Sequence, residues 1–186
     1  LRIIHPPGER IVYANDAFAL AGLLAARAAG LNFETLAQEA LLEPLGMSSS
    51  SFTPGPALQT RLAAAYGTMG GGDGRTDHAD VGAVPPAGSL VTTAGDLAQF
   101  ARLILGEGEI DGVRLLERES VREMLRLQAR SHTEVDDGFG LAFGVREGPG
   151  RRVAWWDGAA PRVGPSDGAP ASGAGVGSAA DAPSPV

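Results

Sequence analysis

Lysine and cysteine are both missing from the 186 residues of this chain, and each absence removes a class of chemistry. All 15 basic side chains other than histidine are arginines, so the chain cannot itself supply a lysine general base, a Schiff-base amine or a P-loop lysine. Without cysteine it forms neither disulfide bonds nor thiolate metal sites, which leaves its cellular compartment open.

An excess of positive charge is missing as well. The formal net charge is -7 at pH 7 and the isoelectric point is about 4.9. Nucleic acids and anionic membrane surfaces bind basic patches, so we expect neither as a partner.

No apolar run approaches the roughly 18 residues that span a bilayer, so we expect no membrane-spanning segment. The N-terminus has no signal-peptide pattern and no initiator methionine, so we expect the chain to begin inside a longer protein.

Helical patterns are interrupted by clear stop signals. Asn15 or Asp16 can cap a first helix that ends at Gly30, and its apolar positions are spread widely enough to predict burial on most sides. Further helices are predicted from Asn32 to about Pro44, after a Thr93 cap with Asp96 in the capping-box position, and over about 118–128. Residues 67–88 read as a long loop.

Strand patterns are concentrated near residue 140. Apolar residues alternate over 139–146 and predict one half-buried strand, and the turn at 148–150 predicts a hairpin with 151–156. Residues 158–186 hold no Leu, Ile, Phe, Tyr or Trp, so we expect a disordered Gly/Ala/Pro-rich tail after a domain at 1–157.

Tyr13-Ala14-Asn15 is a common triplet by itself, and a packed tyrosine before a helix would explain it. Its context resembles the second active-site motif of class C β-lactamases, penicillin-binding esterases and related serine hydrolases. Three later segments resemble the same family in the same order: 42–47 (Leu-Glu-Pro-Leu-Gly-Met), 86–97 (Pro-Ala-Gly-Ser-Leu-Val-Thr-Thr-Ala-Gly-Asp-Leu) and 138–145 (Gly-Phe-Gly-Leu-Ala-Phe-Gly-Val). Four ordered matches over about residues 5–157 are much more specific than any one of them.

The resemblance implies an α/β (α+β) fold with an antiparallel sheet flanked by helices, of the β-lactamase/transpeptidase type and incomplete at both ends. It also implies hydrolysis of an amide or ester through a serine acyl-enzyme, without a cofactor or metal. Tyr13 would act as the general acid or base near the serine, and Asn15 would bind substrate or orient a lysine. The substrate could be a β-lactam, a D-Ala-D-Ala-type peptide or a small ester.

The chain departs from the family at two motifs. No Ser-x-x-Lys exists without lysine, so we expect that motif upstream of Leu1. The third motif, Lys-x-Gly or His-x-Gly, is replaced by Trp156, Asp157 and Gly158 as a degenerate substrate-binding segment. We therefore expect the chain alone to be inactive, and a non-catalytic binding or interaction module that kept the fold is the alternative. We also expect the sequence after about Pro161 to be a frameshift product.

Two weaker patterns give little evidence of a ligand-binding site. The glycine-rich run 70–74 lacks the Lys-Ser/Thr of a phosphate-binding loop, and Asp77-His78-Ala79-Asp80 is more typical of a solvated turn than of a metal site. The serines at 48–51 read as a loop rather than as nucleophiles.

Overall fold

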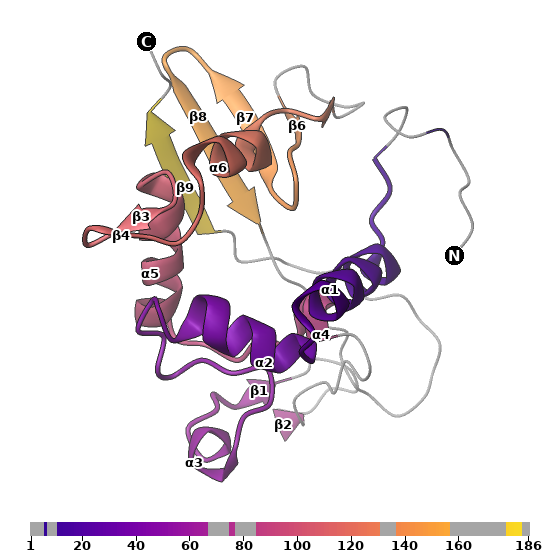
Figure 1. Cartoon of the computed structure of the whole chain (residues 1–186), viewed down its shortest axis with the longest axis vertical. Helices are drawn as coiled ribbons and strands as arrows, with labels where there is room; N and C mark the ends of the chain where they lie inside the picture. Colours follow the sequence, from indigo (N-terminus) through magenta and orange to yellow (C-terminus); the bar gives the residue numbers. More distant parts are fainter. Residues whose placement is uncertain are drawn as a thin grey trace.

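Helices and an antiparallel sheet occupy two halves of the molecule (Figure 1). The structure is a computed structural model that describes Pro6 and residues 11–66, 75–76, 85–130, 137–156 and 178–183. The helical half consists of α1 (Asn15–Ala29), α2 (Phe33–Ala37), η1 (Gln38–Leu42), α3 (Pro56–Gln59) and α4 (Pro85–Gly88). Within the described residues, no helix is long and apolar enough to cross a membrane.

The helix ends mostly follow local signals. Gly30 ends α1 in the left-handed conformation with φ 70°, which glycine adopts without a Cβ penalty. The Asn32 side chain caps α2 by accepting a hydrogen bond from the Thr35 amide at 2.7 Å. The second predicted helix is not one regular α-helix, because α2 passes into the wider π-helical turns of η1 before the turn at residues 43–46.

One side of α1 is buried within this chain and another is exposed. Gly22 and Ala26 are buried, and α1 packs against α4 and α2. Leu20, Leu23 and Leu24 are 41%, 48% and 60% exposed. The sequence prediction that α1 is buried on most sides is therefore wrong within this chain.

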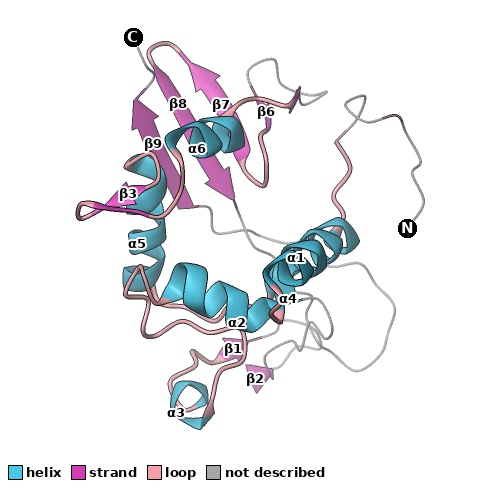
Figure 2. Cartoon of the chain, in the orientation of Figure 1, coloured by secondary structure: helices cyan, strands magenta, loops and turns pink. Residues whose placement is uncertain are grey.

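The sheet contains β5 (Ala129–Arg130), β6 (Asp137–Phe139), β7 (Gly144–Gly148), β8 (Arg151–Trp156) and β9 (Ser178–Pro183), in that order and antiparallel throughout (Figure 2). Helix α6 (Arg118–Leu125) lies across it, and α5 (Ala94–Leu105) lies beside β9. Strand β1 (Ala65–Tyr66) pairs antiparallel with β2 (Arg75–Thr76), and β3 (Glu109–Ile110) forms a short hairpin with β4 (Val113–Arg114). The predicted antiparallel sheet flanked by helices is confirmed.

The prediction of a single strand over 139–146 is wrong, because the chain reverses direction within these residues. Phe139 pairs with Gly144, so β6 and β7 form a hairpin whose turn is residues 140–143. The turn is held by the Gly140 amide donating to the Phe143 carbonyl at 2.9 Å, and Ala142 takes φ 67°. Alternation of apolar residues continues unbroken through this turn, so the pattern indicates extended chain but not the reversal. The predicted hairpin of 151–156 with the strand before it is confirmed as β7–β8.

The expected disorder of residues 158–186 differs from the structure at Ser178–Pro183. These residues form β9 and pair with the whole of β8, from Trp156↔Ser178 to Arg151↔Pro183. A strand can add to an open edge through backbone hydrogen bonds without burying large side chains, and composition does not report this. The rest of the expected tail lies outside the described residues, and its disorder stays a prediction.

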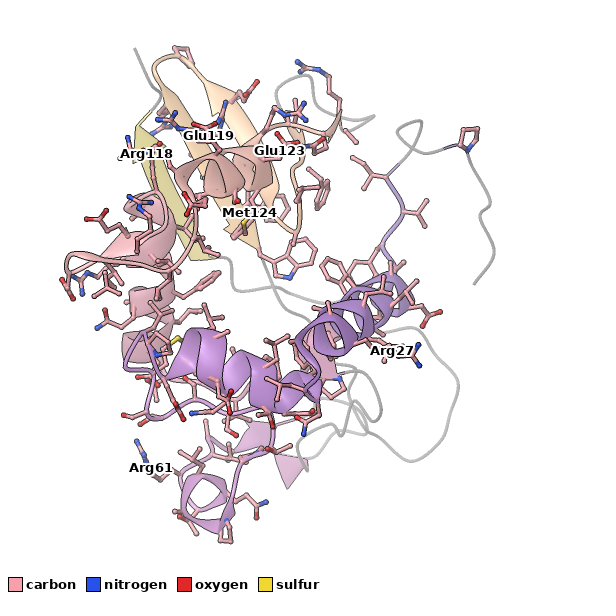
Figure 3. The ribbon with its side chains drawn as sticks, in the orientation of Figure 1. Arg27, Arg61, Arg118, Glu119, Glu123 and Met124 are labelled. Atoms are coloured by element: carbon pink, nitrogen blue, oxygen red, sulfur yellow. The ribbon has the colours of Figure 1, made fainter. Side chains whose placement is uncertain are left out.

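Two clusters of buried side chains form the core. One joins η1 and the turn after it to α5 and β3 through Leu42, Leu45, Met47, Leu103 and Ile110. The other places α5 and α6 against β8 through Ile104, Val121, Leu125 and Ala154. Figure 3 shows the charged residues Glu119 and Glu123 on the side of α6 opposite Met124, as expected for a helix with one apolar face.

Asp96 connects the start of α5 to the serine-rich turn. The Thr93 hydroxyl caps the Asp96 amide at 3.1 Å, which is half of the predicted capping box. The Asp96 carboxylate does not return to Thr93; it accepts from the Ser49 amide and the buried Ser50 hydroxyl, both at 2.8 Å. The Ser50 hydroxyl also lies 2.7 Å from that of Thr92. Ser50 therefore has a structural role, in agreement with a loop rather than a nucleophile.

Replacing Asp96 with alanine should lower the free energy of unfolding by about 2 kcal/mol or more, because two donors lose a charged acceptor in a partly buried site. Urea unfolding followed by circular dichroism measures the effect. Glu39→Ala is the matched control, since it removes an exposed carboxylate and should change stability by less than about 0.5 kcal/mol. Equal stability of the two variants would show that Asp96 does not hold this turn.

Glu123 connects the end of α6 to the segment that leads into β5. The Arg126 guanidinium donates to both oxygens of the Glu123 carboxylate, and the Gln128 amide donates to one of them at 2.9 Å. The hydrogen bonds from Arg126, and then from Gln128, lower the pKa of Glu123 from 4.5 to about 2. The network is solvent-exposed, so its contribution is modest at high salt.

A lowered folded-state pKa means that Glu123 stabilises the fold above pH 4.5 and loses this effect as the pH falls toward about 2. We expect Glu123→Gln to be less stable than the wild type at pH 7, and the difference to shrink between pH 4.5 and 2. Paired urea unfolding curves across this range measure it. A difference that stays constant with pH would argue against the ion pair as its source.

Candidate active-site cleft

A cleft of about 460 Å³ lies between the start of α1 and the sheet. One wall is formed by residues 11–14 with Ala17 and Phe18 of α1. The facing wall is formed by Gln128 just before β5, Ala129 of β5, Phe139 of β6, Gly140 and Ala142 of the β6–β7 turn, and Trp156 at the end of β8. The cleft therefore brings together Tyr13 and Trp156, which the sequence predicted as parts of two different motifs.

Tyr13 and Asn15 form a hydrogen-bonded pair at the helical wall. The Tyr13 hydroxyl donates to Asn15 Oδ1 at 2.7 Å, and the Tyr13 side chain is 69% exposed. The predicted N-cap role of Asn15 or Asp16 is wrong, since α1 begins at Asn15 and the preceding Ala14 makes no side-chain cap. The Asn15 amide oxygen is engaged by the tyrosine instead, which fixes the hydroxyl at the mouth of the cleft.

Trp156 joins the two walls. Its ring centroid lies 6.2 Å from that of Phe18 on α1 and 6.1 Å from that of Phe139 on β6. The Phe139 contact is edge-to-face, with an interplanar angle of 79°, a favourable geometry for aromatic pairs. Asp157 and Gly158, the other two predicted residues of the degenerate motif, lie outside the described residues.

Gln128 belongs to the cleft but to none of the recognised motifs. Its backbone amide donates to the Phe139 carbonyl at 2.8 Å, which extends the pairing of β5 with β6. Its side-chain amide is held by Glu123. No local pattern marks this residue, because only the pairing of β5 with β6 places it opposite Tyr13.

The described lining of the cleft carries no ionisable group except the tyrosine hydroxyl. Every other residue that lines it is apolar, a glycine or the amide Gln128. Among the described residues, no group of three or more His, Cys, Asp or Glu side chains could hold a metal ion. The weak metal pattern at 77–80 and the glycine-rich run at 70–74 lie outside them. The described lining of the cleft can therefore orient the tyrosine hydroxyl and bind apolar groups, but it presents no positively charged side chain.

Solved structures of similar shape carry the same fold. The octameric penicillin-binding protein homologue from Pyrococcus abyssi matches with a TM-score of 0.71 and 21% identity, over 84% of this chain and 35% of that one. A β-lactamase/D-alanine carboxypeptidase from Pseudomonas syringae matches with a TM-score of 0.64 and 22% identity, over 80% of this chain and 39% of that one. The chain therefore has the β-lactamase/transpeptidase-like fold, and it covers 35% and 39% of these two solved chains.

An uncharacterized protein of Mycobacterium tuberculosis is 31% identical over 162 residues, which are 83% of this chain and 40% of the relative. The chain thus spans less than half the length of the proteins it matches. The sequence model of the β-lactamase family matches residues 1–175. That range continues past Pro161, where we expected family-like sequence to end, and so does not support a frameshift at that point. With nearly the whole sequence matched by this one model, the chain belongs to the β-lactamase family.

Proposed function

We propose that this chain contributes the proton-transferring tyrosine and the apolar substrate walls of a serine hydrolase that cleaves amides or esters through an acyl-enzyme. The observation that carries the proposal is the Tyr13–Asn15 hydrogen bond at the mouth of the cleft, in a member of the β-lactamase family. The nucleophilic serine and its lysine would come from polypeptide outside this sequence, since the chain contains no Ser-x-x-Lys.

In the proposed reaction, the serine hydroxyl attacks the substrate carbonyl while its proton passes to the general base. The tetrahedral intermediate collapses to the acyl-enzyme, and the amine or alcohol leaves with a proton returned by the same relay. Water then attacks the ester, and the acid and free serine are released. Tyr13 is suited to this relay because its hydroxyl is exposed to the cleft and oriented by Asn15.

The cleft walls favour a substrate with an apolar acyl group. Phe18, Phe139 and Trp156 offer ring surface, and the volume of about 460 Å³ falls within the range of small-molecule sites. A β-lactam, a peptide ending in small residues or a small ester would all fit this description. Trp156 replaces the basic residue that the third motif would use to hold a substrate carboxylate, so a neutral ester suits this wall better than an anionic one.

The same replacement supports the second candidate, a non-catalytic binding module. Trp156 packs on Phe18 and Phe139 where the family motif has a cation, so the cleft could retain ligand binding without turnover. The two candidates differ in whether a covalent acyl intermediate forms.

Purified alone, the chain should not hydrolyse a chromogenic β-lactam or a p-nitrophenyl ester above the buffer rate, because it carries no Ser-x-x-Lys. Absorbance assays and mass spectrometry after incubation with a fluorophosphonate measure turnover and acylation. A covalent adduct on any serine of this chain would overturn the assignment of the nucleophile to another segment. Reversible binding of the β-lactam by the isolated chain would favour the binding module.

In a protein that unites this sequence with a Ser-x-x-Lys segment, Tyr13→Phe should lower kcat by about 10²-fold or more, as expected for loss of a general acid or base. The phenyl ring keeps the packing, so the thermal unfolding midpoint should change little. Leu141→Ala is the control, since Leu141 is exposed on the nearby β6–β7 turn and does not line the cleft. Full activity of the phenylalanine variant would reduce Tyr13 to a packing role.

A further inference from the structure

Four aromatic side chains line the cleft and come from both of its walls. Tyr13 and Phe18 belong to the helical wall, Phe139 lies on β6, and Trp156 is the last residue of β8. Tyr13 is 69% exposed and Trp156 is 37% exposed, while Phe18 and Phe139 are half-buried. Ring surface is therefore open to a ligand on both sides of the cleft.

The rings are inclined to one another rather than stacked. The plane of Trp156 makes an angle of 57° with that of Phe18 and of 79° with that of Phe139. Rings set at such angles form a corner in which a compact group can contact more than one ring face. Each face carries the negative part of the ring quadrupole, which attracts a cation.

The charges around the cleft do not oppose a cation. No described residue of its lining is positively charged. Arg126 and Arg130, the arginines closest in sequence to Gln128 and Ala129, line a separate hollow that includes none of the four aromatic residues. Asp16 in the first turn of α1 offsets the partial positive charge of the helix N-terminus. The net charge of -7 attracts cations to the protein in preference to anions.

The polar groups of the lining favour one kind of cation. A primary ammonium carries three N–H donors, which need acceptors when they leave water. The side-chain acceptors in the described lining are the Tyr13 hydroxyl and the Gln128 amide, and the Gln128 oxygen already accepts from Arg126 at 3.3 Å. A quaternary ammonium has no donor to satisfy, and aromatic faces bind it directly.

We propose that the four aromatic residues of the cleft bind a quaternary ammonium group of the substrate. The inference rests on the proposed function and names its substrate class, an ester or amide that carries a trimethylammonium-type substituent. Trp156 determines this specificity, because the position where the family motif has a cation supplies the ring face that binds one. The charge preference of this wall is thus the reverse of that expected for a basic residue.

Ligand-detected NMR with the wild-type chain tests the inference by comparing choline with its uncharged isostere 3,3-dimethylbutan-1-ol, which has the same shape. We expect choline to bind at least about threefold more tightly, because only the charged probe gains the attraction to the rings. Trp156→Leu should bring the ratio of the two affinities close to one, whereas Trp156→Phe keeps a ring and should retain part of the preference. The matched control Phe52→Leu alters an aromatic pair outside the cleft and should keep the wild-type ratio.

Circular dichroism of each variant shows whether the fold is intact, and Phe18→Leu makes the same test from the helical wall if Trp156→Leu does not fold. Equal affinity for the two probes, absence of choline binding, or an unchanged preference in the folded leucine variant would overturn the inference. The measurement needs no nucleophile. A choline preference without an acyl-enzyme in the protein that includes a Ser-x-x-Lys segment would leave the inference standing while the proposed catalytic function fails. Hydrolysis of neutral esters without a choline preference would do the reverse.

Discussion

The contact of Trp156 with Phe18 and Phe139 is the point on which the arrangement of this chain depends. It connects the last residue of β8 to α1 and to β6, which belong to the two halves of the fold. The cleft exists because these rings hold the start of α1 opposite the sheet. Dispersion and ring geometry act here rather than charge, so the junction depends little on salt or pH.

This choice of residue also sets the chemistry of the cleft. A cation at the position of Trp156 would attract an anionic substrate and favour the deprotonated form of a neighbouring hydroxyl. The indole instead supplies packing surface, and the polar groups at the helical wall are the hydrogen-bonded side chains of Tyr13 and Asn15. Trp156 therefore contributes packing surface to the cleft rather than a charge.

Two carboxylates stabilise the frame around the cleft in different ways. Asp96 accepts hydrogen bonds from a turn more than forty residues away in sequence, in a partly buried site. Glu123 makes short-range bonds to Arg126 and Gln128 on the surface. Removing the Asp96 carboxylate would leave partly buried donors without an acceptor, whereas solvent screens the interactions of Glu123. Both orient segments that lead to the core or to the cleft without entering it.

The sequence by itself determined the features that depend on neighbouring residues. The left-handed end of α1 at Gly30, the caps at Asn32 and Thr93 and the β7–β8 hairpin were all readable, because backbone conformation and short-range hydrogen bonds decide them. Tertiary structure alone decided the reversal at 140–143, the direction of the Asp96 carboxylate, the place of Gln128 in the cleft and the exposure of the α1 leucines. Each of these depends on which distant segment lies alongside, and alternation or helical spacing carries no information about that partner.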